Sequence, residues 1–589
     1  MTNWHIENNV ICLSLADGNT FYPTAKDIFV QKDFDTFKYK EKRYSPLSDL
    51  NIRFSSLAAR PLLRLEYNNK IGLHLIVHYG DKDYEVGKIG TSFVDYIIVD
   101  KVWRYIEYTS DFINGLLKQR DIDPFDISYS DYAYLIQEIS KSSINIEDKV
   151  AEETTKIKES TAPMTPHGLK AELFPYQIGG SNWLDFMIKQ QCGCILGDEM
   201  GLGKTLQIIA VIGLLKERRN KIHCLVVCPI SLLENWRREV EKFYPSLSTQ
   251  IHYGPQRTGD YRILLDTDIV IMPYSCSVSD AGMLTMIKWD LLIIDEAQNI
   301  KNPRTQRTKA IKRLKRDVPI AVTGTPFQNH MTDLWSLVDY ILPGHLGNLS
   351  VFEQTYTDNE KSAIRLESIL TPLMLRRRVS EVAKDLPERI DIPLPIKMSE
   401  NEAFLYEDSR NSKSPIEELR NMQLAKIQKL RTFCTHPCVY DSCYLGVDPI
   451  TISNKYARLC EILEEIVETK EKVVIFTSFT KMIDLLVSDL RKRFNVYTDF
   501  IDGRIEAMQR QVKIDNFSNI EGSAILILNP NAVGAGLNIT CANHAIHYNL
   551  EWNPAVEDQA SARVYRRGQK KKVFIYRLFY AYTIEEIIK

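Results

Sequence analysis

The fold of this chain is decided by one short stretch, Gly197-Asp198-Glu199-Met200-Gly201-Leu202-Gly203-Lys204-Thr205. An apolar run, Cys194–Leu196, precedes it and a helix-like segment, residues 206–212, follows it, which is the strand–loop–helix order of a P-loop. In such a loop the glycines let backbone N–H groups close around phosphates, Lys204 neutralises charge on the β- and γ-phosphates, and the Thr205 hydroxyl reaches Mg²⁺. A purely structural glycine-rich turn is the alternative interpretation. The pattern favours an ATP site formed by Asp198, Glu199, Met200, Gly201, Leu202, Gly203, Lys204 and Thr205.

A second motif follows an apolar run, where Leu291-Leu292-Ile293-Ile294 is continued by Asp295 and Glu296. Four consecutive aliphatic residues suit a parallel strand that is covered on both faces. We expect Asp295 to hold Mg²⁺ and Glu296 to orient and deprotonate the water that attacks the γ-phosphate. An Asp-Glu pair alone usually marks only the end of a strand, but downstream of a P-loop the catalytic interpretation is favoured.

Length and composition indicate a large globular protein without a strongly basic surface. The chain has 589 residues, 44% of them hydrophobic and 25% charged, and a net charge of -2. This length predicts three or four domains. Because the net charge is close to zero, any contact with nucleic acid is expected to come from local patches or from backbone amides.

The cysteines indicate reduced thiols rather than a disulfide framework. There are 11 of them, an odd number without regular spacing, which favours a cytoplasmic protein. Neither a basic-then-apolar leader nor a long apolar run is found in the sequence, so no contact with a membrane is expected. The group Cys434, His436, Cys438 and Cys443 fits no common zinc template, and no structural zinc is expected.

Changes of pattern divide the chain into five parts. Residues 1–145 alternate apolar and polar residues around turns and predict a β-rich domain, a small antiparallel sheet or barrel. Residues 146–166 are charged and poor in apolar residues and predict a linker. Residues 167–343 alternate apolar strands with helices, which predicts an α/β lobe with a parallel sheet. Residues 344–452 predict helical insertions, and residues 453–589 predict a second α/β lobe without a P-loop.

The strands of the two lobes are expected at short, mainly apolar runs. In the first lobe these are residues 194–196, 224–228, 269–272, 291–294 and 319–322, and in the second lobe residues 473–476, 525–528 and 545–548. Near the end of the second lobe, Arg563 and Arg566 are three residues apart and share one helix face. Two arginines on a helix are more often solvated, but here both are placed to reach an ATP bound on the other lobe.

Together these tracts resemble the SWI/SNF-type family of superfamily-two ATPases, and the resemblance extends roughly from Leu169 to Lys589. It implies two RecA-like lobes that close on ATP, with Arg563 and Arg566 acting on the γ-phosphate. Asp198 also occurs in the P-loop of this family. The resemblance implies that Gln177 contacts adenine and that Gln328, within residues 323–329, belongs to the segment that couples hydrolysis to movement of the lobes. It places nucleic-acid contacts at Ser231, Trp236, Ser478, Asn538 and Trp552.

Some positions depart from the common pattern of the family. Gln298 stands where many members have histidine, which resembles a bacterial or archaeal branch. Ala562 replaces a usual aspartate, Tyr565 a usual histidine, and Asn549 a usual aspartate, so the surroundings of the two arginines are expected to differ. The chain ends at Lys589, inside a helix that opens at Thr583, where relatives continue into a further helix.

The resemblance implies an ATP-dependent translocase on double-stranded DNA that remodels or displaces bound proteins. A role in bacterial antiviral defence or repair is expected ahead of a role in recycling RNA polymerase. The alternative class is a nucleotide-switched binding module. An unknown protein partner is expected to bind through residues 1–145.

Overall fold

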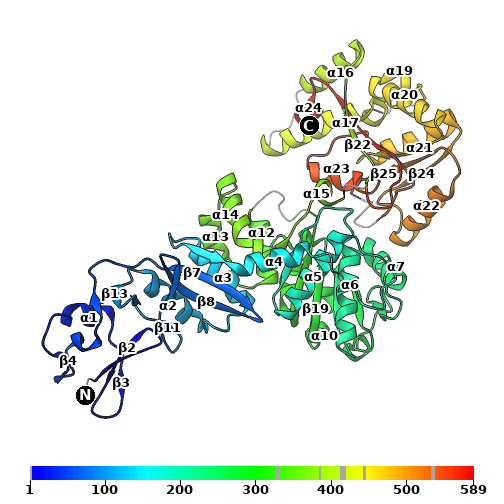
Figure 1. The fold of residues 1–589 in the computed structure, drawn as a ribbon. Helices are drawn as coiled ribbons and strands as arrows, with labels where there is room; N and C mark the ends of the chain where they lie inside the picture. Colours follow the sequence, from blue (N-terminus) through cyan, green and yellow to red (C-terminus); the bar gives the residue numbers. More distant parts are fainter. Residues whose placement is uncertain are drawn as a thin grey trace.

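The computed structural model describes residues 3–162, 164–324, 331–383, 386–411, 419–441, 446–531 and 537–588, and the side chains of residues 419–425, 507 and 508 are outside this description. Two α/β lobes, each built on a parallel sheet, follow a β-rich N-terminal region, as the sequence predicts. Figure 1 shows that the N-terminal region extends from the first lobe on the side away from the second lobe, so it does not stand between the two lobes.

The first lobe contains a seven-stranded parallel sheet in the order β17-β18-β16-β19-β20-β15-β21. The five strands expected from aliphatic runs are all present, and β16 and β18 are buried at every position because helices cover both faces. Their bounds are β15 (Cys194–Leu196), β16 (Cys224–Cys228), β17 (Thr249–Ile251), β18 (Ile269–Pro273), β19 (Trp289–Asp295), β20 (Arg316–Val322) and β21 (Met374–Leu375). The helices between them are α5 (Pro175–Lys189), α6 (Lys204–Arg218), α7 (Leu233–Phe243), α8 (Tyr261–Leu264), α9 (Cys276–Ser279), α10 (Ala281–Leu284), α11 (Gln306–Arg313) and α12 (Met331–Ile341).

The second lobe contains a six-stranded parallel sheet in the order β22-β27-β26-β23-β25-β24. Its strands are β22 (Arg389–Ile396), β23 (Lys472–Phe476), β24 (Tyr497–Ile501), β25 (Ala524–Leu528), β26 (His544–His547) and β27 (Val573–Tyr580). The helix expected near Ser453 is α20 (Asn454–Glu468), and the Ser453 side chain caps it. The remaining helices of this lobe are α21 (Thr480–Phe494), α22 (Ala507–Asn519), α23 (Pro554–Ser561) and α24 (Ile584–Ile588).

Residues 344–452 are more than helical insertions, so that prediction was incomplete. They do contain the helices α13 (Leu349–Thr355), α14 (Glu360–Leu370), α15 (Val379–Val382), α16 (Glu400–Asn411), α17 (Leu419–Thr435), α18 (Pro437–Tyr440) and α19 (Pro449–Ile452). However, β21 pairs with β15 in the first sheet, and β22 pairs along its whole length with β27 in the second. The segment therefore supplies an edge strand to each lobe and carries the chain from one lobe to the other.

The N-terminal region is a set of small sheets rather than one barrel. The turn expected at Asn68-Asn69 joins β7 (Leu62–Asn68) to β8 (Lys70–Tyr79), and the turn at Gly80-Asp81 joins β8 to β9 (Lys82–Glu85). The other strands are β1 (Trp4–Glu7), β2 (Val10–Ser14), β3 (Thr20–Phe21), β4 (Phe37–Tyr39), β5 (Lys42–Tyr44), β6 (Arg53–Phe54), β10 (Lys88–Ile89), β11 (Ser92–Phe93), β12 (Tyr96–Val99) and β13 (Val102–Tyr105). Three helices accompany them, α1 (Ala25–Gln31), α2 (Thr109–Arg120) and α3 (Tyr129–Ile139).

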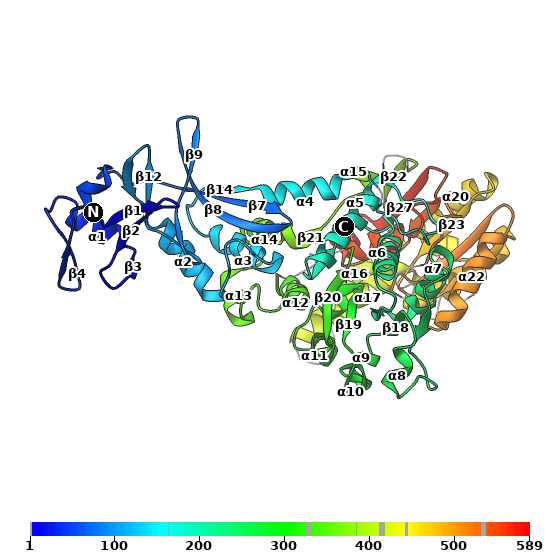
Figure 2. The same cartoon turned by 60° about the horizontal axis from the view of Figure 1, so that its bottom comes forward.

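The predicted linker, residues 146–166, is instead mostly regular structure. Its first part is β14 (Ile146–Asp148), which pairs in parallel with β7, and this strand continues into α4 (Lys149–Glu159). The α4 helix then lies against α5, where a Cβ on Gly179 would be only 2.0 Å from the Lys158 carbonyl oxygen. Figure 2 shows α4 running from the N-terminal sheet to α5. Its charged residues misled the prediction because they occupy the solvated face of a helix.

The N-terminal region and the first lobe share one continuous hydrophobic core. Phe186 of α5 contacts two rings of the N-terminal region, with centroids 5.8 Å from Tyr67 and 5.3 Å from Tyr129. The Tyr129 hydroxyl donates to the Pro372 carbonyl oxygen at 3.2 Å, and Gln190 Nε2 donates to the Tyr67 hydroxyl at 3.2 Å. These contacts make the two parts one packed unit.

Within the described residues, ten cysteines are free thiols, and no helix is long and apolar enough to span a bilayer. Both ring nitrogens of His436 make hydrogen bonds to backbone, since Nδ1 accepts from Cys438 N at 3.1 Å and Nε2 lies 3.2 Å from the Pro449 carbonyl oxygen. His436 thus acts as the cap of α18. Cys443 of the same group lies outside the described residues.

Candidate active site

A cavity of about 440 Å³ lies between the two lobes. The first lobe contributes the P-loop, part of α7 and the end of β19, and the second lobe contributes the segment that follows α23. The structure therefore brings together, in one space, residues that are more than 350 positions apart in sequence, such as Lys204 and Arg563. The lining includes Gln177, Met200, Gly201, Gly203, Lys204, Thr205, Asp295, Glu296, Asn538, Ala562, Arg563 and Arg566.

The P-loop has the backbone conformation that its glycines allow. Gly201 and Gly203 adopt φ values of +89° and +72°, a region that residues with a side chain rarely occupy. Lys204 opens α6, and its ammonium group donates to the carbonyl oxygens of Asp198 at 2.8 Å and Glu199 at 3.4 Å. Burial lowers the pKa of Lys204, while the negative charges of Glu296, Asp198 and Asp295 act in the opposite direction. The loop thus holds a desolvated cation at the start of a helix, as an anion site requires.

Three of the predicted P-loop contacts turn their side chains away from this cavity. Asp198 is fully buried and pairs with Arg377, whose Nη2 is 2.5 Å from the carboxylate Oδ2. Glu199 Oε2 accepts from the backbone N–H of Val379 at 2.6 Å. Leu202 packs in a small apolar cluster with Tyr176. Any contact of these residues with phosphate would therefore come from the backbone and not from the side chain.

Asp295 is the last residue of β19, and Glu296 follows it directly at the edge of the cavity. The Asp295 carboxylate accepts from the indole N–H of Trp236 at 2.9 Å and from the backbone N–H of Glu296 at 2.9 Å. Burial raises the pKa of Asp295 to about 6, the charge of Glu296 adds to the rise, and the hydrogen bond from Trp236 opposes it. Two fixed donors hold this carboxylate in one orientation, as a metal ligand needs.

Glu296 has an unusual backbone and a fixed neighbour. Its φ is +51°, in the left-handed region that non-glycine residues seldom occupy. The Gln298 side chain connects it to the next segment, because Nε2 donates to Glu296 Oε2 at 2.7 Å and Oε1 accepts from the Thr323 hydroxyl at 3.1 Å. Gln298, the residue that stands in place of the common histidine, therefore couples Glu296 to the strand end that leads into residues 323–329.

Arg563 and Arg566 of the second lobe reach into the same cavity. Arg563 is 6% exposed, and its buried Nη2 has no hydrogen-bond partner among the residues that the structure describes. Burial lowers the pKa of Arg563 to about 10, and the charge of Glu296 opposes this shift. A Cβ on Gly201 would lie 3.1 Å from Arg566 Cβ, so Arg566 packs directly on the P-loop. A desolvated guanidinium with an unused donor is suited to an anion that enters the cavity.

The opposite end of the cavity is aromatic and is closed by a second-lobe arginine. The guanidinium of Arg567 lies 3.6 Å from the centroid of the Phe174 ring. Gln177, predicted to contact adenine, is 3% exposed and hydrogen-bonds to backbone, with Oε1 accepting from Phe174 N at 3.1 Å and Nε2 donating to the Leu202 carbonyl oxygen at 3.2 Å. A flat apolar face beside a carboxamide suits a purine base.

The lining fits the groups that the P-loop implies. Positively charged Lys204, Arg563 and Arg566 face the carboxylates of Asp295 and Glu296 in a desolvated space, and within the described part of the chain the donor at Arg563 Nη2 is unpaired. The cations match a triphosphate, and the Thr205 hydroxyl with the Asp295 carboxylate offers the oxygen ligands that Mg²⁺ prefers. Near these groups, Gly203 leaves no room for a side chain, since a Cβ there would lie 2.4 Å from Gln177 Nε2.

The predicted nucleic-acid contacts do not form one set. Trp236 was wrongly predicted, because it is 1% exposed and donates to Asp295 instead. Asn538 is exposed but lines the cavity between the lobes, and its Oδ1 accepts from Thr540 N at 3.3 Å. Ser231 is half-buried, Ser478 hydrogen-bonds to the carboxylate of Glu551, and Trp552 is 53% exposed. Gln328 lies outside the described residues.

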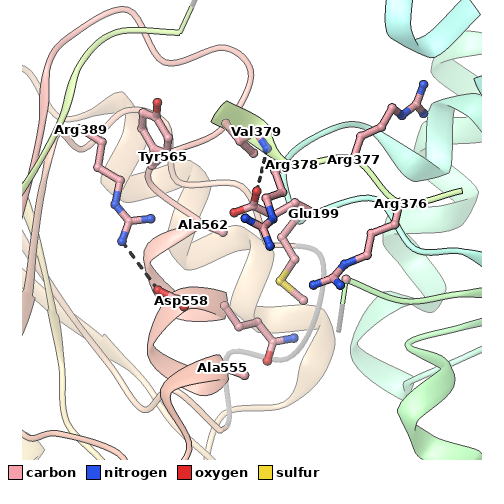
Figure 3. A pocket seen from close by; sticks show the side chains of 13 residues that line it. Glu199, Arg376, Arg377, Arg378, Val379, Arg389, Ala555, Asp558, Ala562 and Tyr565 are labelled. Atoms are coloured by element: carbon pink, nitrogen blue, oxygen red, sulfur yellow. Dashed lines mark hydrogen bonds and ion pairs between the residues drawn. The ribbon is translucent and has the colours of Figure 1, made fainter. Parts of the chain in front are cut away.

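Several residues at the site were missed by the sequence analysis. Glu239 lines the cavity beside Arg566, and burial raises the pKa of this carboxyl group while the charge of Arg566 opposes the rise. Arg567 and Phe174 approach each other only because the lobes meet, so no local sequence pattern predicts their contact. Arg377 lies in a run of three arginines, residues 376–378 (Figure 3), and this basic run is the sequence signal that could have indicated the segment.

Comparison with known proteins agrees with this geometry. The profile of the SNF2-related domain matches residues 176–439, and that of the helicase conserved C-terminal domain matches residues 454–568. A Bacillus subtilis protein named putative ATP-dependent helicase/translocase YwqA is 37% identical over 71% of this chain and 47% of its own length. An uncharacterized ATP-dependent helicase of Mycoplasma pneumoniae is 34% identical over 70% of this chain and 40% of its own length.

A solved structure, the Sulfolobus solfataricus SWI2/SNF2 ATPase core in complex with dsDNA, is 34% identical and covers 72% of this chain and 91% of that chain, with a TM-score of 0.39. The chain belongs to the SNF2, or SWI/SNF-type, family of superfamily-two ATPases. It spans less than half the length of the two curated bacterial relatives.

Proposed function

We propose that this protein hydrolyses ATP to move along double-stranded DNA and to remodel or displace what is bound there. The observation that carries the proposal is the composite cavity, in which Lys204 and Glu296 of one lobe face Arg563 of the other. A site that is complete only when two lobes meet makes hydrolysis depend on their relative position. Two comparisons support movement along DNA. The names of relatives mention a helicase or translocase, and an archaeal relative was solved with double-stranded DNA.

The chemical step is assigned to residues of this chain. Glu296 accepts a proton from water, whose oxygen attacks the γ-phosphorus, and the bond from that phosphorus to the bridging oxygen breaks, which leaves ADP and inorganic phosphate. Lys204 and Arg563 stabilise the charge that spreads over the phosphoryl oxygens. Thr205 and Asp295 would hold Mg²⁺, which neutralises phosphate charge when it is bound. An arginine supplied in this way is typically worth about 10³ to 10⁵ in rate.

Movement follows from the same geometry. Gln298 links Glu296 to Thr323, at the start of the segment that contains Gln328, so a change at the catalytic carboxylate is transmitted along the first lobe. Contacts with the duplex through Ser231, Ser478 and Asn538 would run to phosphates and would carry no sequence information. Each cycle of closing and opening would then shift the two lobes along the duplex.

The test is steady-state ATP hydrolysis with and without duplex DNA, combined with displacement of a triplex-forming strand from a duplex. The wild-type protein should be stimulated by DNA and should displace the strand. Glu296→Gln and Lys204→Ala should abolish both activities with the fold retained, whereas Glu353→Gln, an exposed change on α13, should not. Hydrolysis that persists in Glu296→Gln would contradict the assignment of Glu296 as the group that accepts a proton from water. Slow turnover that ignores DNA would instead support a nucleotide-switched binding module.

The proposed cellular role covers the compartment, the pathway and the protein partner. We place the protein in the cytoplasm, in bacterial antiviral defence or repair, with a protein partner bound through residues 1–145. Because these residues share a core with the first lobe, the whole chain should be used as bait. Stoichiometric binding of the whole chain to purified RNA polymerase would favour polymerase recycling instead.

A further inference from the structure

The first hairpin of the chain brings together three side chains of types that bind metal ions. β1 and β2 pair in antiparallel register, with His5 opposite Cys12 and Glu7 opposite Val10. One donor atom of each of His5, Glu7 and Cys12 lies within 4.8 Å of the other two, and no other such group occurs among the described residues. Figure 2 shows the hairpin at the N-terminal end of the molecule, far from the second lobe, so it takes no part in the ATP cavity.

The turn between the two strands sets the register on which this group depends. Asn8 and Asn9 have φ values of +48° and +62°, and a two-residue hairpin turn of type I′ requires positive φ at both positions. Asparagine tolerates this region better than most residues with a side chain. Because alternate residues of a strand share one face, His5 and Glu7 lie on the same face of the hairpin as Cys12. A slip of one residue would move Cys12 to the opposite face.

The three donor types select one class of ion. Imidazole nitrogen, thiolate sulfur and carboxylate oxygen are ligands of Zn²⁺, whereas Mg²⁺ and Ca²⁺ prefer oxygen ligands alone. Zinc lies about 2.0 to 2.3 Å from such atoms, so the ligands of a tetrahedral site are about 3.3 to 3.5 Å apart. His5 and Glu7 are exposed, so their side chains can rotate by the small amount that brings the donors to this separation.

Cys12 is the fixed member of the group. The residue is 1% exposed, and its thiol donates to the Val10 carbonyl oxygen, 3.5 Å from Sγ, which is a weak bond. A Cys12 thiolate and the Glu7 carboxylate would together balance the two positive charges of Zn²⁺, and the His5 imidazole would bind in its neutral form. A charge in such a buried place is stable when it coordinates a metal.

We propose that His5, Glu7 and Cys12 bind one Zn²⁺ ion, with the fourth coordination position open to water. The ion would join β1, which is the edge strand of the sheet β1-β2-β3, to the central strand β2. Three protein ligands and one open position are typical of zinc sites that exchange a ligand. The proposal revises the expectation of no structural zinc, which was drawn from the group around Cys434.

The experiment uses the whole chain without a histidine tag, after removal of metal with a chelator. Zn²⁺ affinity is measured by competition with a chromophoric chelator, in an excess of Mg²⁺ that occupies oxygen sites such as Asp295. Co²⁺ then replaces Zn²⁺ as a spectroscopic probe, because a thiolate bound to Co²⁺ gives a charge-transfer band in the near ultraviolet. The site variants are Cys12→Ser, which keeps the size of the buried side chain, and His5→Gln, which changes an exposed residue.

The chain offers a matched control for each variant. Cys541→Ser removes a partly exposed free thiol of the second lobe. His78→Gln removes an exposed histidine that pairs with Asp83 on the hairpin formed by β8 and β9.

We expect the wild-type protein to bind one equivalent of Zn²⁺ with a dissociation constant of about 1 μM or lower. Cys12→Ser should lose the charge-transfer band, His5→Gln should weaken Zn²⁺ binding at least about tenfold, and both controls should behave as wild type. Equal Zn²⁺ binding by the wild type and the two site variants would mean an adventitious ion only and would overturn the proposal. A wild-type dissociation constant above about 100 μM would overturn it as well.

Discussion

Arg377 forms a two-point ion pair with Asp198, in which Nη2 lies 2.5 Å from Oδ2 and Nε lies 2.9 Å from Oδ1. The same guanidinium donates to Gln207 Oε1 at 2.9 Å, and it hydrogen-bonds to the carbonyl oxygen of Tyr176. Asp198 is fully buried, so this pair is shielded from water and salt. Asp198 occupies the position where the strict P-loop pattern G-x-x-x-x-G-K-S/T has its first glycine. Through this residue, the chain that leaves β21 is therefore attached to the nucleotide site.

Asp198→Gly, which restores the strict P-loop pattern, is predicted to destabilise the protein instead of improving ATP binding. Removal of the carboxylate leaves Arg377 buried without its counter-ion, and breaking a buried pair in this way costs about 3–5 kcal/mol. Chemical unfolding should show this loss in the transition of the first lobe. In Asp198→Asn/Arg377→Met, where both charges are removed, much of the stability should return. A stable Asp198→Gly protein would contradict the prediction.

Trp236→Phe is predicted to weaken the response to Mg²⁺ while the core stays intact. The indole N–H is one of two donors that fix the Asp295 carboxylate, and loss of such a supporting contact typically costs about 10- to 100-fold in metal affinity. Phenylalanine keeps most of the buried aromatic volume. Mg²⁺ titration of ATP hydrolysis at saturating ATP measures the effect, and thermal unfolding checks the fold. An unchanged Mg²⁺ midpoint would show that Trp236 only fills the core.

Sequence reasoning worked where both faces of a strand are buried. Runs such as residues 224–228 and 525–528 are apolar throughout because helices cover both sides of each sheet, so composition alone identifies them. By contrast, β22 contains Pro393 and Pro395 and alternates in exposure, since it is an edge strand. Its partner β27 lies about 180 residues further along the chain, and no local pattern connects the two.

The types of residue at the site could be predicted from the sequence, but the directions in which their side chains point could not. Lys204, Asp295 and Glu296 follow from motifs whose chemistry requires them, and the structure gathers them in one cavity. Trp236 lies close in sequence to Ser231, yet its side chain points into the core because it sits on the inner face of α7. In the same way, a charged stretch predicted a linker, although Val150 and Thr154 form the buried stripe of α4.

Arg563→Gln is predicted to lower the rate of hydrolysis about 10³-fold or more while ATP still binds. The guanidinium of Arg563 is desolvated, and its Nη2 donates to none of the described residues, so it is available to the charge that develops on the phosphoryl group. Single-turnover hydrolysis and binding of a fluorescent ATP analogue separate the two effects. Arg458→Gln, on the exposed face of α20, serves as the control. If ATP binding and hydrolysis fell by the same factor, Arg563 would already interact with ATP in the bound ground state, and its role would not be specific to the transition state.

Acid is predicted to weaken the junction between the N-terminal region and the first lobe. His345 is 4% exposed, and neither of its ring nitrogens has a hydrogen-bond partner in the parts of the chain that the structure describes. Burial lowers the pKa of His345 to about 4 from 6.5, and the positive charges of Arg120 and Lys141 add to the shift. These cations are themselves paired, Arg120 with Asp131 at 3.5 Å and Lys141 with Glu138 at 2.5 Å.

The direction of the pH dependence follows from whether the folded or the unfolded protein protonates His345 more readily. Below pH 6.5 the unfolded chain protonates His345 before the folded protein does, so stability is lost as pH falls, by about 2 kcal/mol between pH 6.5 and 5.0. His345→Leu should remove this part of the pH dependence in urea unfolding and leave stability at pH 7.5 nearly unchanged. His167→Gln, a change at a fully exposed histidine, should keep the wild-type dependence. Parallel pH curves for wild type and His345→Leu would refute the assignment.

Trp552→Ala is predicted to weaken binding of duplex DNA about 5- to 30-fold without changing ATP hydrolysis in the absence of DNA. Trp552 is 53% exposed, yet the guanidinium of Arg431, from α17, lies 5.2 Å from its ring and is itself anchored on the Leu550 carbonyl oxygen at 2.9 Å. A large aromatic side chain held rigid at the surface is a typical binding contact. Because tryptophan carries no charge, affinity should fall equally at all salt concentrations, with the slope of log K against log salt unchanged. Phe404→Ala, which removes an even more exposed ring on α16, is the matched control, and an equal effect of both changes would contradict a specific role for Trp552.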